Sequence, residues 1–283
     1  MSTATNTKAL TYKIANTIEI NRMGYGAMQL TGTGVFGEVA DRPNAIKVLQ
    51  EAVASGVNFI DTAEAYGPQL NESLIGDALH PYRKGVIIAT KGGFNRPGPG
   101  QWVPNGSPEF IRENIEGSLK RLKVDTIDLW QLHRFDSNIS IEKTLAPVAE
   151  AVNTGKIRYV GLSEVGIKQI EQAEKIVPIV SVQNLYNLGN RQWEEVLDYT
   201  SDRNMAFIPW YPLASGPAKL QDKIGAIAKK HNATVAQIAL AWLLKRSNNI
   251  LLIPGTKSIT HLHENLDAVK IELSDEDFAS LSN

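Results

Sequence analysis

The sequence predicts an α/β protein folded as one (β/α)8 barrel, the TIM barrel, over residues 1–283. Eight short, β-branched apolar runs alternate with stretches of helical periodicity along the chain, as repeated strand–helix units do. Several of these runs are apolar on both faces, which is typical of strands buried in a parallel sheet. No linker-like change of composition divides the chain. A doubly wound open sheet is the alternative fold.

The first expected element is a small β-hairpin that precedes the barrel. Its two strands, Ala9–Tyr12 and Thr17–Ile20, flank a turn at Ala15-Asn16. We expect this hairpin to close the bottom of the barrel.

The barrel elements then follow in alternation. Strands are expected at Met23–Leu30, Val57–Asp61, Val86–Lys91, Ile127–His133, Ile157–Ser163, Ile179–Gln183, Ala206–Tyr211 and Ile250–Pro254. Helices are expected at Asn44–Ala54, Ser107–Leu122, Ile141–Val152, Gly166–Ile176, Arg191–Arg203 and Thr234–Lys245, with Ser274 capping a last one. The helix at Ser107 is the clearest, because a capping serine precedes a proline in the first turn and a regular apolar face follows.

Two loops are longer than the others, Thr31–Asp41 and Gly92–Gly106. Both follow strands, so in a barrel they lie at the C-terminal face, where active sites of this fold are built. The glycines of the first loop spell GxGxxG, the pattern of a dinucleotide-binding turn. However, no helix can begin before about Pro43, and that motif requires the turn to lead directly into a helix. We therefore interpret this segment as a loop.

Composition excludes several classes of function. Twenty-nine basic and 30 acidic residues give a net charge of −1, so a partner with a polyanionic surface, nucleic acid or membrane, is not expected. The absence of cysteine excludes disulfides, thiolate nucleophiles and cysteine-bound metals. His261, His263 and Glu264 lack the spacing of metal ligands, so no metal site is expected. Without a signal peptide or a membrane-length apolar run, the chain is expected to be a cytoplasmic protein.

Polar residues of complementary chemistry follow the strands. Asp61, Lys91 and His133 each end a predicted strand, and Tyr66 comes five residues after Asp61. Parallel strands of a barrel end at one rim, so these side chains can meet although they are far apart in sequence. Taken alone, the spacing leaves two interpretations open: a shared active site, or turn and cap residues satisfied locally.

Several sequence blocks carry a resemblance to a known family. The blocks are Val57–Gly67, Ile88–Gly92 (IATKG), Asp128–His133 (DLWQLH), Gly161–Glu164 (GLSE), Gln183–Asn187 (QNLYN) and Leu252–Asn265 (LIPGTKSITHLHEN). In this order they resemble the signature blocks of the aldo-keto reductases and cover nearly the whole chain. Met23–Gly37 resembles in particular the bacterial branch that includes pyridoxal reductases.

The resemblance implies a (β/α)8 barrel that binds NADPH without a Rossmann domain and reduces aldehydes or ketones. It places the catalytic tetrad on Asp61, Tyr66, Lys91 and His133. Tyr66 would protonate the developing oxyanion, and the Lys91 ammonium would lower the pKa of Tyr66. Asp61 would keep Lys91 charged, and His133 would orient the carbonyl oxygen.

The same resemblance implies a set of NADPH-binding residues. Ser163 and Gln183 match the pair that hydrogen-bonds the nicotinamide carboxamide, and Trp210 falls where an aromatic residue, most often Tyr, stacks on the ring. Glu164 replaces the usual Asn, which puts one carboxamide contact in doubt, since an ionised Glu only accepts hydrogen bonds. The remaining positions are Leu213, Ser215 and Gly216 for the pyrophosphate, Lys257 and Ser258 for the 2′-phosphate, and Glu264 and Asn265 for adenine.

The expected function is NADPH-dependent carbonyl reduction by a monomer, with pyridoxal as the leading substrate. Met28, Phe36, Trp102 and Phe135 are expected as walls of the substrate pocket. A second hypothesis is a nicotinamide-binding regulatory subunit of the same fold, as some relatives of ion channels are.

Overall fold

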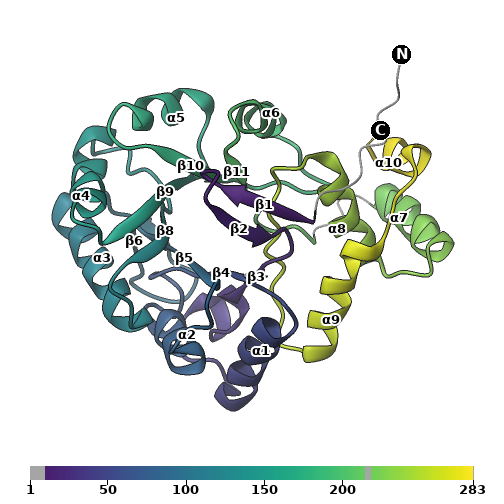
Figure 1. Cartoon of the computed structure of the whole chain (residues 1–283), viewed down its shortest axis with the longest axis horizontal. Coiled ribbons are helices and arrows are strands. Elements are labelled where there is room, and N and C mark those ends of the chain that lie inside the picture. The colour runs from purple at the N-terminus through teal and green to yellow at the C-terminus, as the bar shows by residue number, and fades with distance from the viewer. Residues whose placement is uncertain (1–9, 214–217, 283) are drawn as a thin grey trace.

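The computed structural model describes residues 10–213 and 218–282. Its centre is a parallel sheet in which each strand lies beside the next in the chain (Figure 1). The strands are β3 (Tyr25–Gly26), β4 (Phe59–Asp61), β5 (Ile87–Gly92), β8 (Ile127–Leu132), β9 (Ile157–Ser163), β10 (Ile179–Gln183) and β11 (Ala206–Phe207). This sequential order excludes the doubly wound alternative, in which the strand order reverses near the middle of the sheet.

The segment that follows residue 249 joins the two ends of the sheet. Ile250 pairs in parallel with Phe207 of β11, and Leu252 pairs in parallel with Met23, just before β3. The Leu252 N–H donates to the carbonyl oxygen of Arg22 at 2.8 Å. The chain therefore forms the predicted (β/α)8 barrel, with this segment in the eighth strand position.

Helices surround the barrel (Figure 1). They are α1 (Arg42–Ala54), α2 (Leu70–Leu79), α3 (Pro108–Leu122), α4 (Ile141–Asn153), α5 (Ile167–Glu174), α6 (Glu194–Asp202), α7 (Ala218–Lys230), α8 (Val235–Arg246), α9 (Ile259–Asp267) and α10 (Asp275–Ser282), with short 3-10 turns η1 (Ala27–Gln29), η2 (Thr33–Val35) and η3 (Ala268–Lys270). Within the described residues, each helix is too short or too polar to cross a lipid bilayer.

The expected helices are present, but the sequence analysis did not predict α2. This helix begins after Gln69, whose backbone is left-handed and whose side chain makes no capping bond. Its buried face includes Asn71 and Glu72. Without a capping residue and with polar side chains turned inward, the usual signals of an amphipathic helix are missing.

Helix α7 was not predicted either, although its sequence carries a usable signal. Leu220, Ile224 and Ile227 recur at helical spacing and pack against the main hydrophobic core. The missing prediction here reflects an overlooked pattern rather than an unusual local sequence.

Several predicted strands are shorter than expected, among them Ala206–Tyr211, which forms only the two-residue strand β11. The run Met23–Leu30 forms only the two-residue strand β3 before the chain turns into η1. The run Ile250–Pro254 forms isolated bridges rather than a regular strand. One reason is that the carbonyl oxygen of Ile250 accepts a hydrogen bond from the buried Arg22 side chain at 2.9 Å, not from a neighbouring strand.

The predicted hairpin lies across the centre of the barrel (Figure 1). Its strands, β1 (Thr11–Ile14) and β2 (Ile18–Asn21), pair antiparallel around a turn in which Ala15 and Asn16 have positive φ. Ile14 and Ile20 pack in one cluster with residues that begin the barrel strands, such as Phe59 and Ile87. The hairpin therefore closes the N-terminal end, and the opposite rim stays available for a site.

The long loops after β3 and β5 meet at this opposite rim. The second loop carries a small antiparallel pair, β6 (Phe94–Asn95) and β7 (Val103–Pro104). The N–H of Gly100 donates to the carbonyl oxygen of Gly34 in the first loop at 3.2 Å. The two loops thus form one wall beside the strand ends.

Candidate active site

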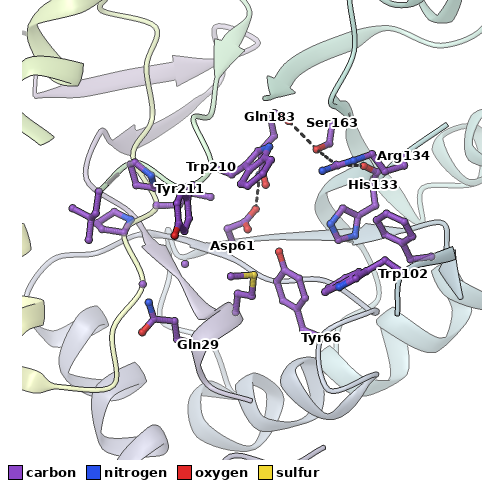
Figure 2. A pocket seen from close by; sticks show the side chains of 18 residues that line it. Gln29, Asp61, Tyr66, Trp102, His133, Arg134, Ser163, Gln183, Trp210 and Tyr211 are labelled. Atoms are coloured by element: carbon purple, nitrogen blue, oxygen red, sulfur yellow. Dashed lines mark hydrogen bonds between the residues drawn. The ribbon is translucent and has the colours of Figure 1, made fainter. Parts of the chain in front are cut away.

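The structure brings Tyr66 and the three strand-end residues together on the C-terminal side of the barrel. Asp61 is the last residue of β4, Lys91 lies near the end of β5, and His133 directly follows β8. Tyr66 comes from the loop after β4, and its hydroxyl points into the same cavity as the His133 ring (Figure 2). All four side chains are buried. Of the two interpretations that the spacing left open, the geometry supports a shared site.

Lys91 is the centre of this group. Its ammonium nitrogen lies 2.6 Å from Asp61 Oδ1, 2.8 Å from the carbonyl oxygen of Thr62 and 3.3 Å from Tyr66 Oη. An ammonium has three hydrogens, and here each has an acceptor. The fully buried cation is therefore hydrogen-bonded in every direction in which it can donate.

The second carboxylate oxygen of Asp61 is also bound. The side-chain amides of Gln183 and Gln131 donate to Asp61 Oδ2 at 2.9 and 3.3 Å. Asp61 thus connects the Lys91–Tyr66 pair to Gln183, one of the residues expected to bind nicotinamide (Figure 2). This network fixes the relative positions of the two parts of the site.

The pKa of Tyr66 differs from the sequence-based expectation. Burial raises the pKa of the Tyr66 phenol above its usual value of 10, and the Lys91 ammonium lowers it by less. Lys91 has the expected effect, but the loss of hydration outweighs it because the charged phenolate is disfavoured away from water. Tyr66 is therefore protonated at neutral pH.

The pKa values of Lys91 and His133 are shifted as well. Burial lowers the pKa of Lys91, but Asp61 and Tyr66 raise it more, and the net direction is upward. Burial, followed by the positive charges of Lys91 and Arg134, lowers the pKa of His133 well below 6.5. At neutral pH the site therefore holds a lysine cation and an uncharged imidazole.

Asp61, Tyr66 and His133 line a cavity of about 620 Å³. Met28 and Trp102 line it, as expected, but Phe36 and Phe135 do not. Phe36 lies near the Arg96 guanidinium, and Phe135 packs against the main hydrophobic core. Phe94 and Tyr211 line the cavity in addition. The sequence identified the loops correctly but not the direction of each aromatic side chain.

The nicotinamide-site candidates lie along the same cavity. Ser163, Gln183 and Trp210 line it (Figure 2), and so does Leu213. Ser163 Oγ donates to the carbonyl oxygen of Gln183 at 2.8 Å and accepts from Arg134 Nη1 at 2.9 Å. The other two expected pyrophosphate-loop residues, Ser215 and Gly216, lie outside the described residues.

The adenosine-site candidates lie outside the lining of this cavity. Lys257 is exposed, and Ser258 caps α9 by accepting from the His261 N–H at 3.3 Å. Glu264 is half-buried, and Asn265 is a buried residue of the same helix. Gly255, two residues before Lys257, does line the cavity, so these candidates continue from one end of it.

The sequence analysis did not identify Gln131, Phe94 or Tyr211. Gln131 had a usable signal, because it lies two residues before His133 and alternate residues of a strand share a face. Phe94 has its ring centroid 4.7 Å from that of His133, but a loop offers no such periodicity. Tyr211 is 63% exposed and has a positive φ, which no local pattern indicates.

Comparison with known sequences gives relatives over nearly the full chain. The profile of the Aldo/keto reductase family matches residues 22–283. An uncharacterized oxidoreductase of Schizosaccharomyces pombe is 48% identical over 275 residues, covering 97% of this chain and 89% of its own. The pyridoxine 4-dehydrogenase of Escherichia coli is 41% identical over 271 residues, covering 94% of this chain and 95% of its own.

Solved structures agree with this assignment. A thermostable aldo-keto reductase in complex with the inhibitor epalrestat has a TM-score of 0.87 and 32% identity, covering 97% of this chain and 99% of its own. An aldo-keto reductase from Klebsiella pneumoniae in complex with NADPH has a TM-score of 0.80 and 28% identity, covering 96% and 93%. With the barrel, the buried Asp–Tyr–Lys–His group and these matches together, the chain belongs to the aldo/keto reductase family.

Proposed function

We propose that the protein reduces an aldehyde or ketone to the alcohol with NADPH, and that pyridoxal is its substrate. The observation that carries the proposal is the buried contact of 3.3 Å between the Lys91 ammonium and the Tyr66 hydroxyl beside the cavity. A phenol placed against a cation can give up its proton to a developing oxyanion more readily than a similarly buried phenol without one.

Each residue of the group has a role in this reaction. When bound, the dihydronicotinamide supplies the hydride that attacks the carbonyl carbon. Tyr66 donates the proton to the oxygen, and Lys91 stabilises the phenolate that remains. Asp61 keeps Lys91 charged in a buried position. His133, uncharged at neutral pH, orients the carbonyl oxygen with a hydrogen bond from its ring.

The residues present fit an NADPH molecule. The Gln183 side chain gives its N–H to Asp61, so its amide oxygen is oriented as an acceptor for a carboxamide N–H. Trp210 supplies a flat surface for the ring. At the other end of the cavity, a Cβ on Gly255 would lie 2.6 Å from the carbonyl oxygen of Gly26, so only a backbone without a side chain fits there. Lys257 and Ser258 are the proposed contacts of the 2′-phosphate.

Two observations support pyridoxal as the substrate. The relative from Escherichia coli, 41% identical, is a pyridoxine 4-dehydrogenase. The cavity also has flat aromatic walls, Trp102, Phe94 and Tyr211, against which a pyridine ring can pack. Arg134 is the one Lys or Arg residue among the described residues that line the cavity. A phosphate group normally requires several such donors, so pyridoxal should be preferred to its 5′-phosphate.

The test is NADPH oxidation with pyridoxal, pyridoxal phosphate, benzaldehydes, methylglyoxal and open-chain sugars. Each turnover should consume one NADPH and one proton and convert one aldehyde to one alcohol. We expect pyridoxal to have the highest kcat/KM. If simple aldehydes have a higher kcat/KM than pyridoxal, the assignment of pyridoxal as the substrate is wrong, while the proposed reductase activity stands. If NADPH binds and no carbonyl is reduced, a regulatory nicotinamide-binding role becomes the better explanation.

A further inference from the structure

The geometry points to Glu164 as a positioning residue that fixes the indole of Trp210 in the wall of the cavity. Trp210 Nε1 donates to Glu164 Oε1 at 2.7 Å. This inference rests on the proposed function, because Trp210 is the surface on which the nicotinamide would stack. It assigns a role to the residue that replaces the usual Asn of the GLSE block.

The carboxylate of Glu164 is held by three donors. Glu164 Oε1 accepts from Trp210 Nε1 and also from the backbone N–H of Leu185. Glu164 Oε2 accepts from Trp193 Nε1 at 3.3 Å. Leu185 follows β10, Trp193 precedes α6 and Trp210 follows β11, so one side chain connects three neighbouring segments at the rim.

Glu164 does not face the cavity. It is absent from the lining, although Ser163, the residue before it, lines the cavity. Its backbone has a φ of 55°, in the left-handed region, and its N–H donates to the carbonyl oxygen of Gln183 at 3.1 Å. With Glu in place of the usual Asn, this side chain therefore binds the indole of Trp210 rather than the nicotinamide carboxamide. Ser163 and Gln183 remain as the proposed ligands of the carboxamide.

Glu164 and Trp210 have complementary hydrogen-bonding groups. A carboxylate only accepts hydrogen bonds and an indole N–H only donates, so two indoles and one backbone N–H suit an ionised Glu. Trp210 stands where the family most often has Tyr, which has no N–H on its ring. The two departures of this chain from the family pattern thus contact each other directly.

The Arg134 guanidinium adds a second restraint on the same indole. Its central carbon lies 5.9 Å from the centroid of the Trp210 ring, within the range of a cation–π contact. Burial lowers the pKa of Arg134, and the negative charge of Glu164 opposes that change. The indole is therefore held through its N–H by an anion and at its ring by a cation.

The experiment is a double-mutant cycle on the full-length protein, with NADPH binding measured by calorimetry. Glu164→Asp shortens the side chain by one methylene, so its carboxylate should no longer reach Trp210 Nε1, and Asp tolerates the left-handed backbone at this position. Like Glu, Asp has no N–H to donate to a carboxamide, so it cannot restore the contact that the family's Asn makes. Trp210→Phe keeps an aromatic ring but removes the N–H. Trp193→Phe is the matched control, because it removes a bond to the same carboxylate from an indole outside the cavity lining.

We expect Glu164→Asp to raise the Kd of NADPH about tenfold, as loss of a charge-assisted hydrogen bond would. In the Trp210→Phe background the same change should alter the Kd by less than about twofold, since coupled residues are non-additive. Trp193→Phe should leave the Kd within about twofold of the wild type. Equal effects of Glu164→Asp in both backgrounds, or no effect in the wild-type background, would overturn the inference.

A second variant keeps the test decisive if Glu164→Asp does not fold. Glu164→Gln retains an oxygen acceptor for Trp210 and places an amide opposite Trp193, so its Kd should lie between those of the wild type and Glu164→Asp. The same cycle run with Glu164→Gln then measures the coupling to Trp210. If the wild type itself binds no NADPH, the proposed function fails and this inference fails with it. If the wild type binds and the cycle shows no coupling, only the inference fails.

Discussion

Lys91 illustrates how single residues in the site depend on one another. A buried ammonium is costly, and here Asp61, Thr62 and Tyr66 each accept one of its hydrogens. Lys91 in turn stabilises the phenolate form of Tyr66, although burial keeps the net pKa of Tyr66 above 10. The site thus holds a proton on Tyr66 at neutral pH and can release it when negative charge develops nearby.

The role of Tyr66 can be tested by replacing it with Phe. This change keeps the ring and removes the proposed proton donor, so carbonyl reduction should fall by about 10²–10⁴, the usual contribution of a general acid. The Kd of NADPH should change by less than about twofold, because the proposed role of the hydroxyl is to protonate the substrate oxygen and not to bind the cofactor. Turnover close to the wild-type value in Tyr66→Phe would contradict the assignment.

His133 should make the stability of the fold depend on pH. Its pKa in the folded protein is well below 6.5, so on acidification the unfolded chain takes up a proton that the folded protein does not. The free energy of unfolding should therefore decrease as the pH falls from about 7 to about 5.

Denaturant titrations at several pH values would measure this effect. His133→Phe should show a shallower decrease than the wild type, and His261→Gln, at an exposed position, should match the wild type. An unchanged slope in His133→Phe would show that other groups cause the pH dependence.

At the scale of elements, the substrate side of the cavity depends on loops joined by Arg96. This buried guanidinium donates to three backbone carbonyl oxygens, those of Ala65 at 2.6 Å, Gln101 at 2.8 Å and Gly34 at 3.0 Å. Its central carbon also lies 3.5 Å from the centroid of the Trp102 ring. One side chain thus connects the loops after β3, β4 and β5 and supports a wall of the cavity.

Arg96→Met should therefore impair substrate binding more than cofactor binding. Without the guanidinium, Trp102 loses its stacking partner, and the KM for an aromatic aldehyde should rise about tenfold, the effect of losing roughly 1.4 kcal/mol of binding energy. The Kd of NADPH should stay within about twofold.

Steady-state kinetics with an aromatic and a small aliphatic aldehyde would check this prediction. Arg96→Lys is the control that keeps the charge but loses the planar fork, and it should recover only part of the effect. If the KM rises equally for both aldehydes, Arg96 does not act through the aromatic wall.

At the scale of the whole molecule, the barrel closes through an irregular strand position that Arg22 supports. The Arg22 side chain is 1% exposed and donates to the carbonyl oxygens of Ile250, Leu244 and Ser247. It therefore joins the start of the barrel to the end of α8 and to the segment in the eighth position. The hydrogen bond to Ile250 alone spans 228 residues of sequence.

Removing this contact should destabilise the fold. In Arg22→Met the three carbonyl oxygens lose a buried donor, and the free energy of unfolding should decrease by about 2–4 kcal/mol. Urea titration would measure the change. Arg112→Met is the control for loss of a surface arginine, since Arg112 is exposed and forms an ion pair with Glu150. A decrease in Arg22→Met no larger than that in Arg112→Met would show that the closure does not depend on Arg22.

The sequence by itself determined the order of the strands and of most helices, the hairpin, and the group formed by Tyr66 and the three strand-end residues. These follow from local patterns: apolar runs predict the strands, and the parallel arrangement brings their ends to one rim. The same rule made Asp61, Lys91 and His133 recognisable as a group before any distance was known. Gln131 could have been predicted in the same way, because it lies on the same strand face as His133.

Only the tertiary structure decided how loop side chains are directed and how charges balance. Phe36 turns out of the cavity and Phe94 into it, because loop residues have no periodicity that fixes their direction. The net pKa of Tyr66 depends on burial by distant segments as well as on Lys91. Glu164 binds Trp210, 46 residues further along the chain. Interactions of this kind depend on which backbone segments meet in space, and a local sequence pattern does not contain that information.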